Sequence, residues 1–127
     1  MRKIEEILND VKTQNDIPSD YELLETYAFL CLKKIIIMYQ NNQITKEQSQ
    51  NLKQKIEGQY NKSVGEYQSR SDLYEKYIRD IKQTESLRIK LRKELNSEET
   101  ITEQRLSEIL MLCLEIIGFY SGEVFQC

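Results

Sequence analysis

Four cations lie close together in the segment SLRIKLRK, residues 86–93. Arg88, Lys90, Arg92 and Lys93 have no acidic residue among them. Arginine and lysine side chains bind phosphate groups and carboxylates, so this run is suited to a nucleic-acid backbone or to an acidic protein surface. Arg88 and Arg92 are four residues apart, and this spacing places them on one face of a helix.

Basic and aromatic residues also precede this segment. Tyrosines recur at a spacing of seven residues from Tyr60 to Tyr74, and arginines alternate with them. The candidate partner-binding residues are therefore Tyr67, Arg70, Tyr74, Tyr77, Arg79, Arg88, Lys90, Arg92 and Lys93. Cations near a helix C-terminus also favour the helix dipole, and acids lie nearby at Asp72, Glu75, Asp80, Glu85 and Glu94. A solvated, salt-bridged face is the more frequent role of such a run, and a binding surface is the alternative.

The residue types needed for most enzyme chemistry are missing from the chain. There is no histidine, which removes Ser-His-Asp and Cys-His nucleophile systems and the commonest zinc ligand. Neither a GxxxxGK[ST] nor a GxGxxG phosphate-binding loop occurs. Three isolated cysteines cannot complete a four-ligand zinc site, and we expect Cys31 and Cys113 to be buried thiols. The sequence thus predicts a protein that is not an enzyme and needs no cofactor or metal.

Glu115 is the one acid set in an apolar run, within residues 109–117. Buried acids are rarely left unpaired, so we expect Glu115 on the wet edge of its helix or beside a basic residue. The alternative is a functional acid with a raised pKa.

The elements that carry these residues are predicted to be helices. The chain has 127 residues with one proline and four glycines, which leaves few residues for tight turns. Its net charge of -3 and pI near 5.2 imply no global attraction to nucleic acid or to anionic lipid. No stretch reaches the roughly 18 apolar residues of a membrane span, and no signal peptide is recognised, so we expect a cytoplasmic protein.

Hydrophobic periodicity predicts one all-α domain over residues 1–127. The predicted helices cover residues 3–14, 20–41, 46–95 and 102–120. For the third helix, a break near residues 61–66, close to Gly58 and Gly65, is an equal alternative. Three capping boxes are expected to start the last three helices, at Ser19–Glu22, Thr45–Gln48 and Thr100–Glu103.

The second and fourth helices are apolar on several sides and need cover. We therefore predict a helical hairpin, a long helix and an apolar C-terminal helix in a bundle-like homodimer that buries one of these two helices. Within the second helix, Lys33 and Lys34 are expected along an edge, with their ammonium groups reaching water. Asn41 and Asn42 are expected to end this helix through left-handed conformations.

The segment ETYAFLCLKKIIIMYQNNQITKEQSQNLKQKIEGQY, residues 25–60, resembles a helical hairpin of small proteins from Firmicutes phages and prophages. The matching residues are Tyr27, Leu30, Leu32, Lys33, Tyr39, Ile44, Glu47, Gln48, Lys53, Ile56 and Tyr60. Asn42 stands where glycine is usual, and Ser49 stands where alanine is usual. KQTESLRIKLRKEL and the later GFYSGE are similar to the second half of such proteins. These are packing and turn residues, so the resemblance transfers no catalytic residue.

The resemblance implies an accessory protein of a mobile element that acts by occupying a surface on a host or phage protein. The most specific function that the resemblance implies is inhibition of a host defence effector such as a CRISPR-Cas nuclease. Such an inhibitor is an anti-CRISPR protein. One alternative is a nucleic-acid-binding accessory protein that uses Arg88, Lys90, Arg92 and Lys93. The other alternative is a scaffolding or packaging component of the virion.

Overall fold

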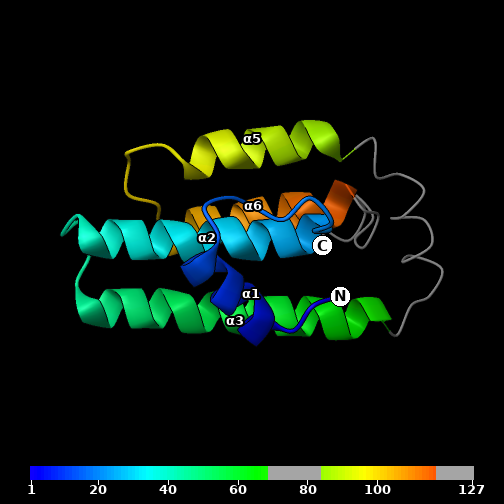
Figure 1. Cartoon of the computed structure of the whole chain (residues 1–127), viewed down its shortest axis with the longest axis horizontal. Coiled ribbons are helices and arrows are strands. Elements are labelled where there is room, and N and C mark those ends of the chain that lie inside the picture. Colours follow the sequence, from blue (N-terminus) through cyan, green and yellow to red (C-terminus); the bar gives the residue numbers. More distant parts are fainter. Residues whose placement is uncertain (69–83, 117–127) are drawn as a thin grey trace.

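The computed structural model describes residues 1–68 and 84–116, and over these ranges the chain is helical and has no strand. The helices are α1 (Ile4–Thr13), α2 (Leu23–Gln40), α3 (Lys46–Gln68), α5 (Glu85–Leu95) and α6 (Glu103–Ile116). They pack side by side with their axes close to one direction, apart from the short α1 (Figure 1). The predicted all-α, bundle-like fold is confirmed. Within the described ranges, no helix has the length and apolar content to cross a membrane.

The central element is α2, because α1, α3, α5 and α6 each pack against it. Every residue from Leu23 to Leu32 is buried. A helix that is apolar on several sides must be covered on several sides, and this confirms the expectation for the second helix. Two buried tyrosines extend the core around α2, since Tyr27 and Tyr60 are 0% and 1% exposed.

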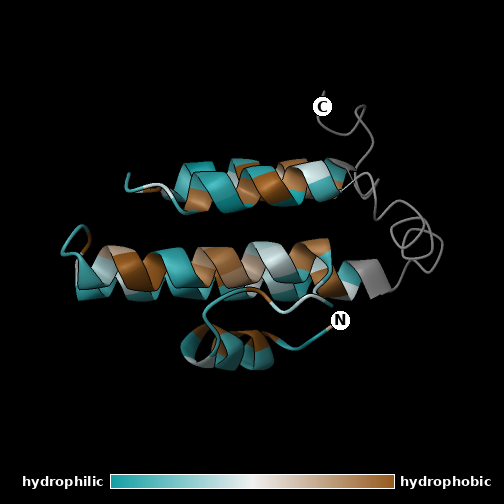
Figure 2. Cartoon of the chain, turned by 45° about the horizontal axis from the view of Figure 1, so that its top comes forward, coloured by the Kyte–Doolittle hydropathy of each residue, from teal (hydrophilic) through white to brown (hydrophobic). Residues whose placement is uncertain are grey.

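Short α1 is amphipathic and covers α2 and α3. Its buried residues, Ile4, Ile7 and Val11, recur at the spacing of one helix face. Figure 2 shows the apolar residues of α1 on the side that faces the bundle. Glu5 and Glu6 lie in its first turn, where a negative charge favours the helix dipole.

The start of α2 differs from the predicted box at Ser19. The N-cap is Glu22, and Glu25 closes the capping box by accepting a hydrogen bond from the Glu22 backbone N–H at 2.8 Å. A turn precedes the helix, closed by the Tyr21 N–H on the Pro18 carbonyl at 3.2 Å. Because Tyr21 is buried in the core, the turn is held there and the helix begins three residues later than predicted.

The turn between α2 and α3 is as predicted at Asn42 and at the cap of α3, but the prediction is wrong for Asn41, whose φ of -89° is not left-handed. Asn42 has a φ of 59°, the left-handed conformation expected at this position. The Gln48 N–H donates to Thr45 Oγ1 at 3.1 Å, and the Thr45 N–H donates to Gln48 Oε1 at 2.8 Å. These two reciprocal bonds form the predicted capping box.

The cap of α6 is displaced from Thr100 to Thr102. The Arg105 N–H donates to Thr102 Oγ1 at 3.2 Å. Ile101 is buried, and its N–H donates to Met38 Sδ at 3.3 Å, so this residue is held against α2 and precedes the helix. The predicted box at Thr100–Glu103 is therefore wrong. Residues 117–120 of the predicted fourth helix lie outside the described residues.

The segment predicted as one helix over residues 46–95 contains two helices, α3 and α5, in the described ranges. They run in opposite directions above and below α2 (Figure 1), so α3 and α5 are two separate elements of the bundle. Leu87, Leu91 and Leu95 of α5 are buried, and α5 packs on α2. The alternative break at 61–66 is absent, because α3 continues to Gln68 and an exposed glycine costs a helix only about 1 kcal/mol.

Candidate protein-binding surface

Helix α5 carries the predicted cationic run and presents only part of it to solvent. Leu87, Leu91 and Leu95 are four residues apart and form the buried side. Five residues of α5 are exposed: Ser86, Ile89, Lys90 and Lys93, which define its outer face, and the acidic Glu85 in its first turn. Ile89 is 63% exposed, the highest value for a large hydrophobic side chain in the described residues.

Arg88 points to the start of α2 and contributes to packing. Its Nη1 donates to the Tyr21 carbonyl at 2.7 Å and to Thr26 Oγ1 at 3.4 Å. Thr26 is a buried polar side chain that gains a partner from this contact. Arg88 thus ties α5 to α2 and does not belong to the outer face.

Arg92 pairs with Asp16 in the α1–α2 connection. Its Nη1 lies 2.6 Å and 2.8 Å from the two carboxylate oxygens. The Ile17 backbone N–H and the Arg92 guanidinium together lower the pKa of Asp16. Both side chains remain exposed to a large extent, so the ion pair adds little stability. Its main effect is that the guanidinium of Arg92 is already paired with a carboxylate.

The acid that follows the cationic run is directed away from it. Glu94 pairs with Arg105 of α6, and Arg105 Nη1 also lies 3.1 Å from Glu108 Oε2. These two carboxylates raise the pKa of Arg105. Lys90 and Lys93 pair with no carboxylate in the part of the chain that the structure describes, so the outer face of α5 keeps two uncompensated cations.

The remaining predicted partner-binding residues precede α5. Tyr67 belongs to the last turn of α3, but its side chain is not among the described ones. Arg70, Tyr74, Tyr77 and Arg79 lie outside the described residues. Their part in a binding surface stays a prediction.

Helix α6 has an acidic outer face, for which the sequence held no recognisable motif. A shallow hollow is lined by Gln104, Ser107, Glu108, Met111, Leu112 and Glu115. Met111 is 38% exposed and Leu112 is half-buried, so apolar surface lies beside the two carboxylates. Glu115 is exposed, which confirms its expected place on the wet edge of the helix.

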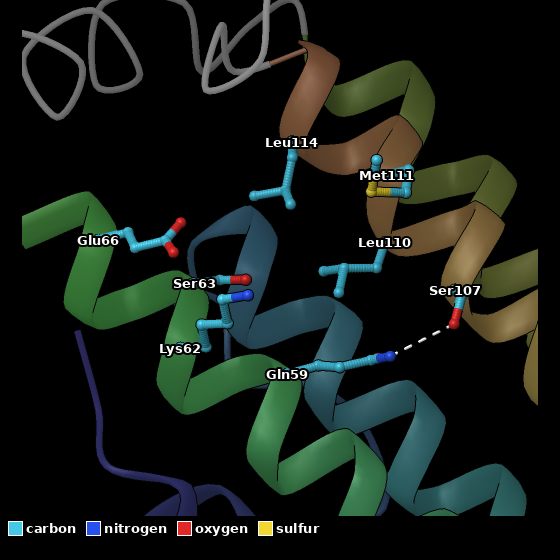
Figure 3. A pocket seen from close by; sticks show the side chains of 8 residues that line it. All are labelled: Gln59, Lys62, Ser63, Glu66, Ser107, Leu110, Met111 and Leu114. Carbon is cyan, nitrogen blue, oxygen red and sulfur yellow. Dashed lines mark hydrogen bonds between the residues drawn. The ribbon is translucent and has the colours of Figure 1, made fainter. Parts of the chain in front are cut away.

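A second hollow, of about 250 Å³, lies between α3 and α6 (Figure 3). Leu110, Met111 and Leu114 form its α6 wall, and Lys62, Ser63 and Glu66 lie along the α3 wall. Gln59 Nε2 donates to Ser107 Oγ at 3.3 Å across one end. Sequence periodicity does not reveal this hollow, because residues from two helices distant in sequence form it.

Arg2 and the buried Glu25 form a partly buried ionic contact at the N-terminal end of the bundle. Glu25 Oε2 accepts from the Arg2 backbone N–H at 3.0 Å and from Arg2 Nη1 at 2.9 Å. The guanidinium lies 4.6 Å from the centre of the Tyr21 ring, and Tyr60 Oη donates to the Arg2 carbonyl at 2.5 Å. This network attaches the first residues to α2 and α3, and its partners are too far apart in sequence to be predicted.

Two buried thiols and one buried amine complete the chemistry of the described residues. Cys31 and Cys113 are free and 0% exposed, as predicted. Burial raises the pKa of both thiols, that of Cys113 to about 12. Lys34 is 2% exposed and donates to the Ser97 carbonyl, so its expected place on a wet edge is wrong. The α5–α6 connection covers Lys34, whereas Lys33 is partly exposed and donates to the Asn15 carbonyl.

Within the described ranges, no three acids and cysteines gather closely enough to hold a metal ion. The strongest candidate for function is a binding face formed by the outer residues of α5, because Ile89 is exposed there beside two lysines. No protein-family model, no curated protein and no solved structure gives a match to this chain.

Proposed function

We propose that this protein is a non-enzymatic interaction protein that docks onto an acidic surface of another protein through the outer face of α5. The observation that carries the proposal is Ile89, which is 63% exposed beside two lysines. Neither Lys90 nor Lys93 has a carboxylate partner in the described ranges. An apolar side chain bordered by cations has the composition of a small interface, with an apolar centre and a polar rim.

The geometry of α5 favours a protein partner. Ile89 and Lys93 are one turn apart and share a side of the helix, and Ser86 is small enough to let another backbone approach. A partner that buries Ile89 gains apolar contact, and carboxylates around that contact would speed association and select the orientation of the complex. Nucleic acid is less favoured, because two lysines neutralise few phosphates and an isoleucine offers them no contact.

The resemblance of residues 25–60 to phage and prophage proteins narrows the proposed target. It supports a host protein as the partner, and a defence effector such as a CRISPR-Cas nuclease is the leading candidate. The proposal includes action by stoichiometric binding in the cytoplasm of the host bacterium, and a homodimer as the form in solution.

A capture experiment from host lysate tests the proposed face. Ile89→Asp and Lys90→Glu/Lys93→Glu should each lose a protein that the native chain retains. Ile37→Asp is the matched control, since Ile37 is 37% exposed on α2 and lies outside the proposed face. Retention by all variants alike would reject the α5 face.

The identity of the target is tested by plating phage on defended and undefended hosts that express the chain. Better plating on the defended host alone, lost with Ile89→Asp, supports an inhibitor of defence. Equal plating on both hosts contradicts it. A mobility-shift assay at two salt concentrations tests the nucleic-acid alternative, which requires binding that weakens as salt rises.

A further inference from the structure

We propose that the outer faces of α5 and α6 together bind a second copy of this chain, so that self-association covers the α5 face offered to a partner. Only the statement that self-association covers the face offered to a partner rests on the proposed function. The interface itself is argued from the charges and register of the two helices.

The two faces are complementary in charge and both contain apolar residues. The α5 face carries Lys90 and Lys93 beside the exposed Ile89. The α6 face carries Glu108 and Glu115 beside Met111. One copy thus holds both halves of an interface, which is the requirement for a symmetric dimer.

The two helices are neighbours and antiparallel. The Glu94–Arg105 ion pair joins them, and the colours of Figure 1 show their opposite directions. Figure 2 shows them as one layer of the bundle, with α2 and α3 as the other. A two-fold axis parallel to the helices would place this layer on that of a second copy, with each α5 opposite the other copy's α6.

Such symmetry leaves no freedom in the register along the helices. Residues 94 and 105 lie at one level because of their ion pair, so Lys93 lies level with residue 106, and Lys90 with residue 109, of the second copy. At about 1.5 Å per residue, Glu108 of that copy is within about 3 Å of both levels. Ile89 is then level with residue 110, next to Met111 and Leu112.

The size of the shared face predicts a weak dimer. Helix α5 has 11 residues and is therefore about 16 Å long. Two adjacent helices give a face about 20 Å wide, so the shared face is well below the roughly 800 Å² per partner of a standard specific interface. We therefore expect dissociation at micromolar concentrations, so that dilution or a tighter-binding partner exposes the α5 face.

Sedimentation velocity of the full chain from about 5 to 500 μM tests the interface, a range chosen around the micromolar affinity expected. The native chain should shift from monomer to dimer across this range. Glu108→Lys and Lys93→Glu should each weaken the dimer about tenfold or more, because each brings like charges together. The chain with both substitutions, or an equimolar mixture of the two single variants, should recover the dimer.

Lys12→Glu is the control, since Lys12 is exposed on α1, which packs on α2 and α3 and is not part of the α5–α6 layer. Circular dichroism shows whether each variant is folded, which matters for Glu108 because it also pairs with Arg105. A native chain that stays monomeric at 500 μM, the top of the range (about a hundredfold above the start), overturns the proposal. Failure of the double variant to recover the dimer overturns it as well.

The two proposals fail separately. Capture of a host protein through α5 by a chain that never dimerises would leave the proposed α5 binding face standing and reject the homodimer. A charge-dependent dimer that captures no host protein would leave the α5–α6 interface standing and reject the binding of a host protein. If both hold, Glu108→Lys, which frees α5 by weakening the dimer, should increase capture at high protein concentration.

Discussion

Arg2 Nη1 lies 2.9 Å from Oε2 of Glu25, a carboxylate that is only 1% exposed. The contact joins two residues 23 positions apart and attaches the N-terminal segment to the first turn of α2. A buried carboxylate without its cation keeps the cost of its lost hydration.

Replacement of Arg2 by Met should therefore destabilise the fold by about 3 kcal/mol, since one partner of a buried pair is removed. Urea unfolding followed by circular dichroism measures the change. Glu25→Gln in the same chain should restore part of the loss, because the uncompensated charge is then gone. Loss of less than about 1 kcal/mol in the single variant would show that the pair behaves as a surface contact.

Gly58 and Gly65 should each be replaceable by Ala with a gain in stability. Both are in the interior of α3, and a Cβ added at either position meets nothing within 4 Å. Alanine favours the helix by about 0.5–1 kcal/mol relative to glycine, so the melting temperature should rise. Gly58→Pro is the opposing control and should cost about 3 kcal/mol. A decrease with Gly65→Ala would indicate that the helix does break near this residue.

Lys34 should make the free energy of unfolding depend on pH in the alkaline range. Its burial lowers the pKa of the folded state below the ordinary lysine value, so the unfolded state binds more protons between the two pKa values. The contribution of Lys34 to the free energy of unfolding should therefore rise with pH through this window, up to about pH 10. Lys34→Met should remove that rise.

The comparison of native and Lys34→Met chains isolates this effect, because ionisation of the unfolded cysteines is common to both. Near neutral pH the two should differ by about 1 kcal/mol or less, since the lost bond to the Ser97 carbonyl is offset by the removal of a buried charge. Parallel pH profiles of the two chains would contradict a lowered pKa for Lys34.

Cys31 and Cys113 should resist alkylation in the folded protein. Both are fully buried, and the pKa of Cys113 is raised to about 12, so almost no thiolate is present at pH 8. In a Cys127→Ser background, iodoacetamide should react about a thousandfold more slowly than with free cysteine, and urea should abolish the protection. Alkylation at the free rate without denaturant would show that the core around α2 opens readily.

Much of the fold follows from local patterns. The spacing of Ile4, Ile7 and Val11 predicts α1, and the Thr45–Gln48 box predicts the start of α3. Such features depend on residues within one or two turns, so the sequence shows them directly. The two misplaced caps, at the starts of α2 and α6, have a different cause. Tyr21 and Ile101 are buried against distant parts of the chain, and their burial decides where each helix begins.

The candidate surface also has features that the sequence shows directly and features that depend on the tertiary structure. The sequence identified a cationic run in residues 86–93 and an exposed role for Glu115, because both depend on one helix. It could not tell Arg88 and Arg92, which pair with residues of the α1–α2 connection and α2, from Lys90 and Lys93. Which side of α5 is covered depends on where α2 lies.

Composition and periodicity alone were therefore enough for an all-helical chain without the residues of common catalytic sites. The tertiary structure decided which charged side chains of the described ranges pair within the fold and which are exposed without an ion pair. The reason is that a side chain's hydrogen bonds and burial are set by helices far away in sequence. Glu94 illustrates this: beside Lys93 it looks like a neutralising neighbour, but in the fold it pairs with Arg105, and Lys93 has no carboxylate partner in the described ranges.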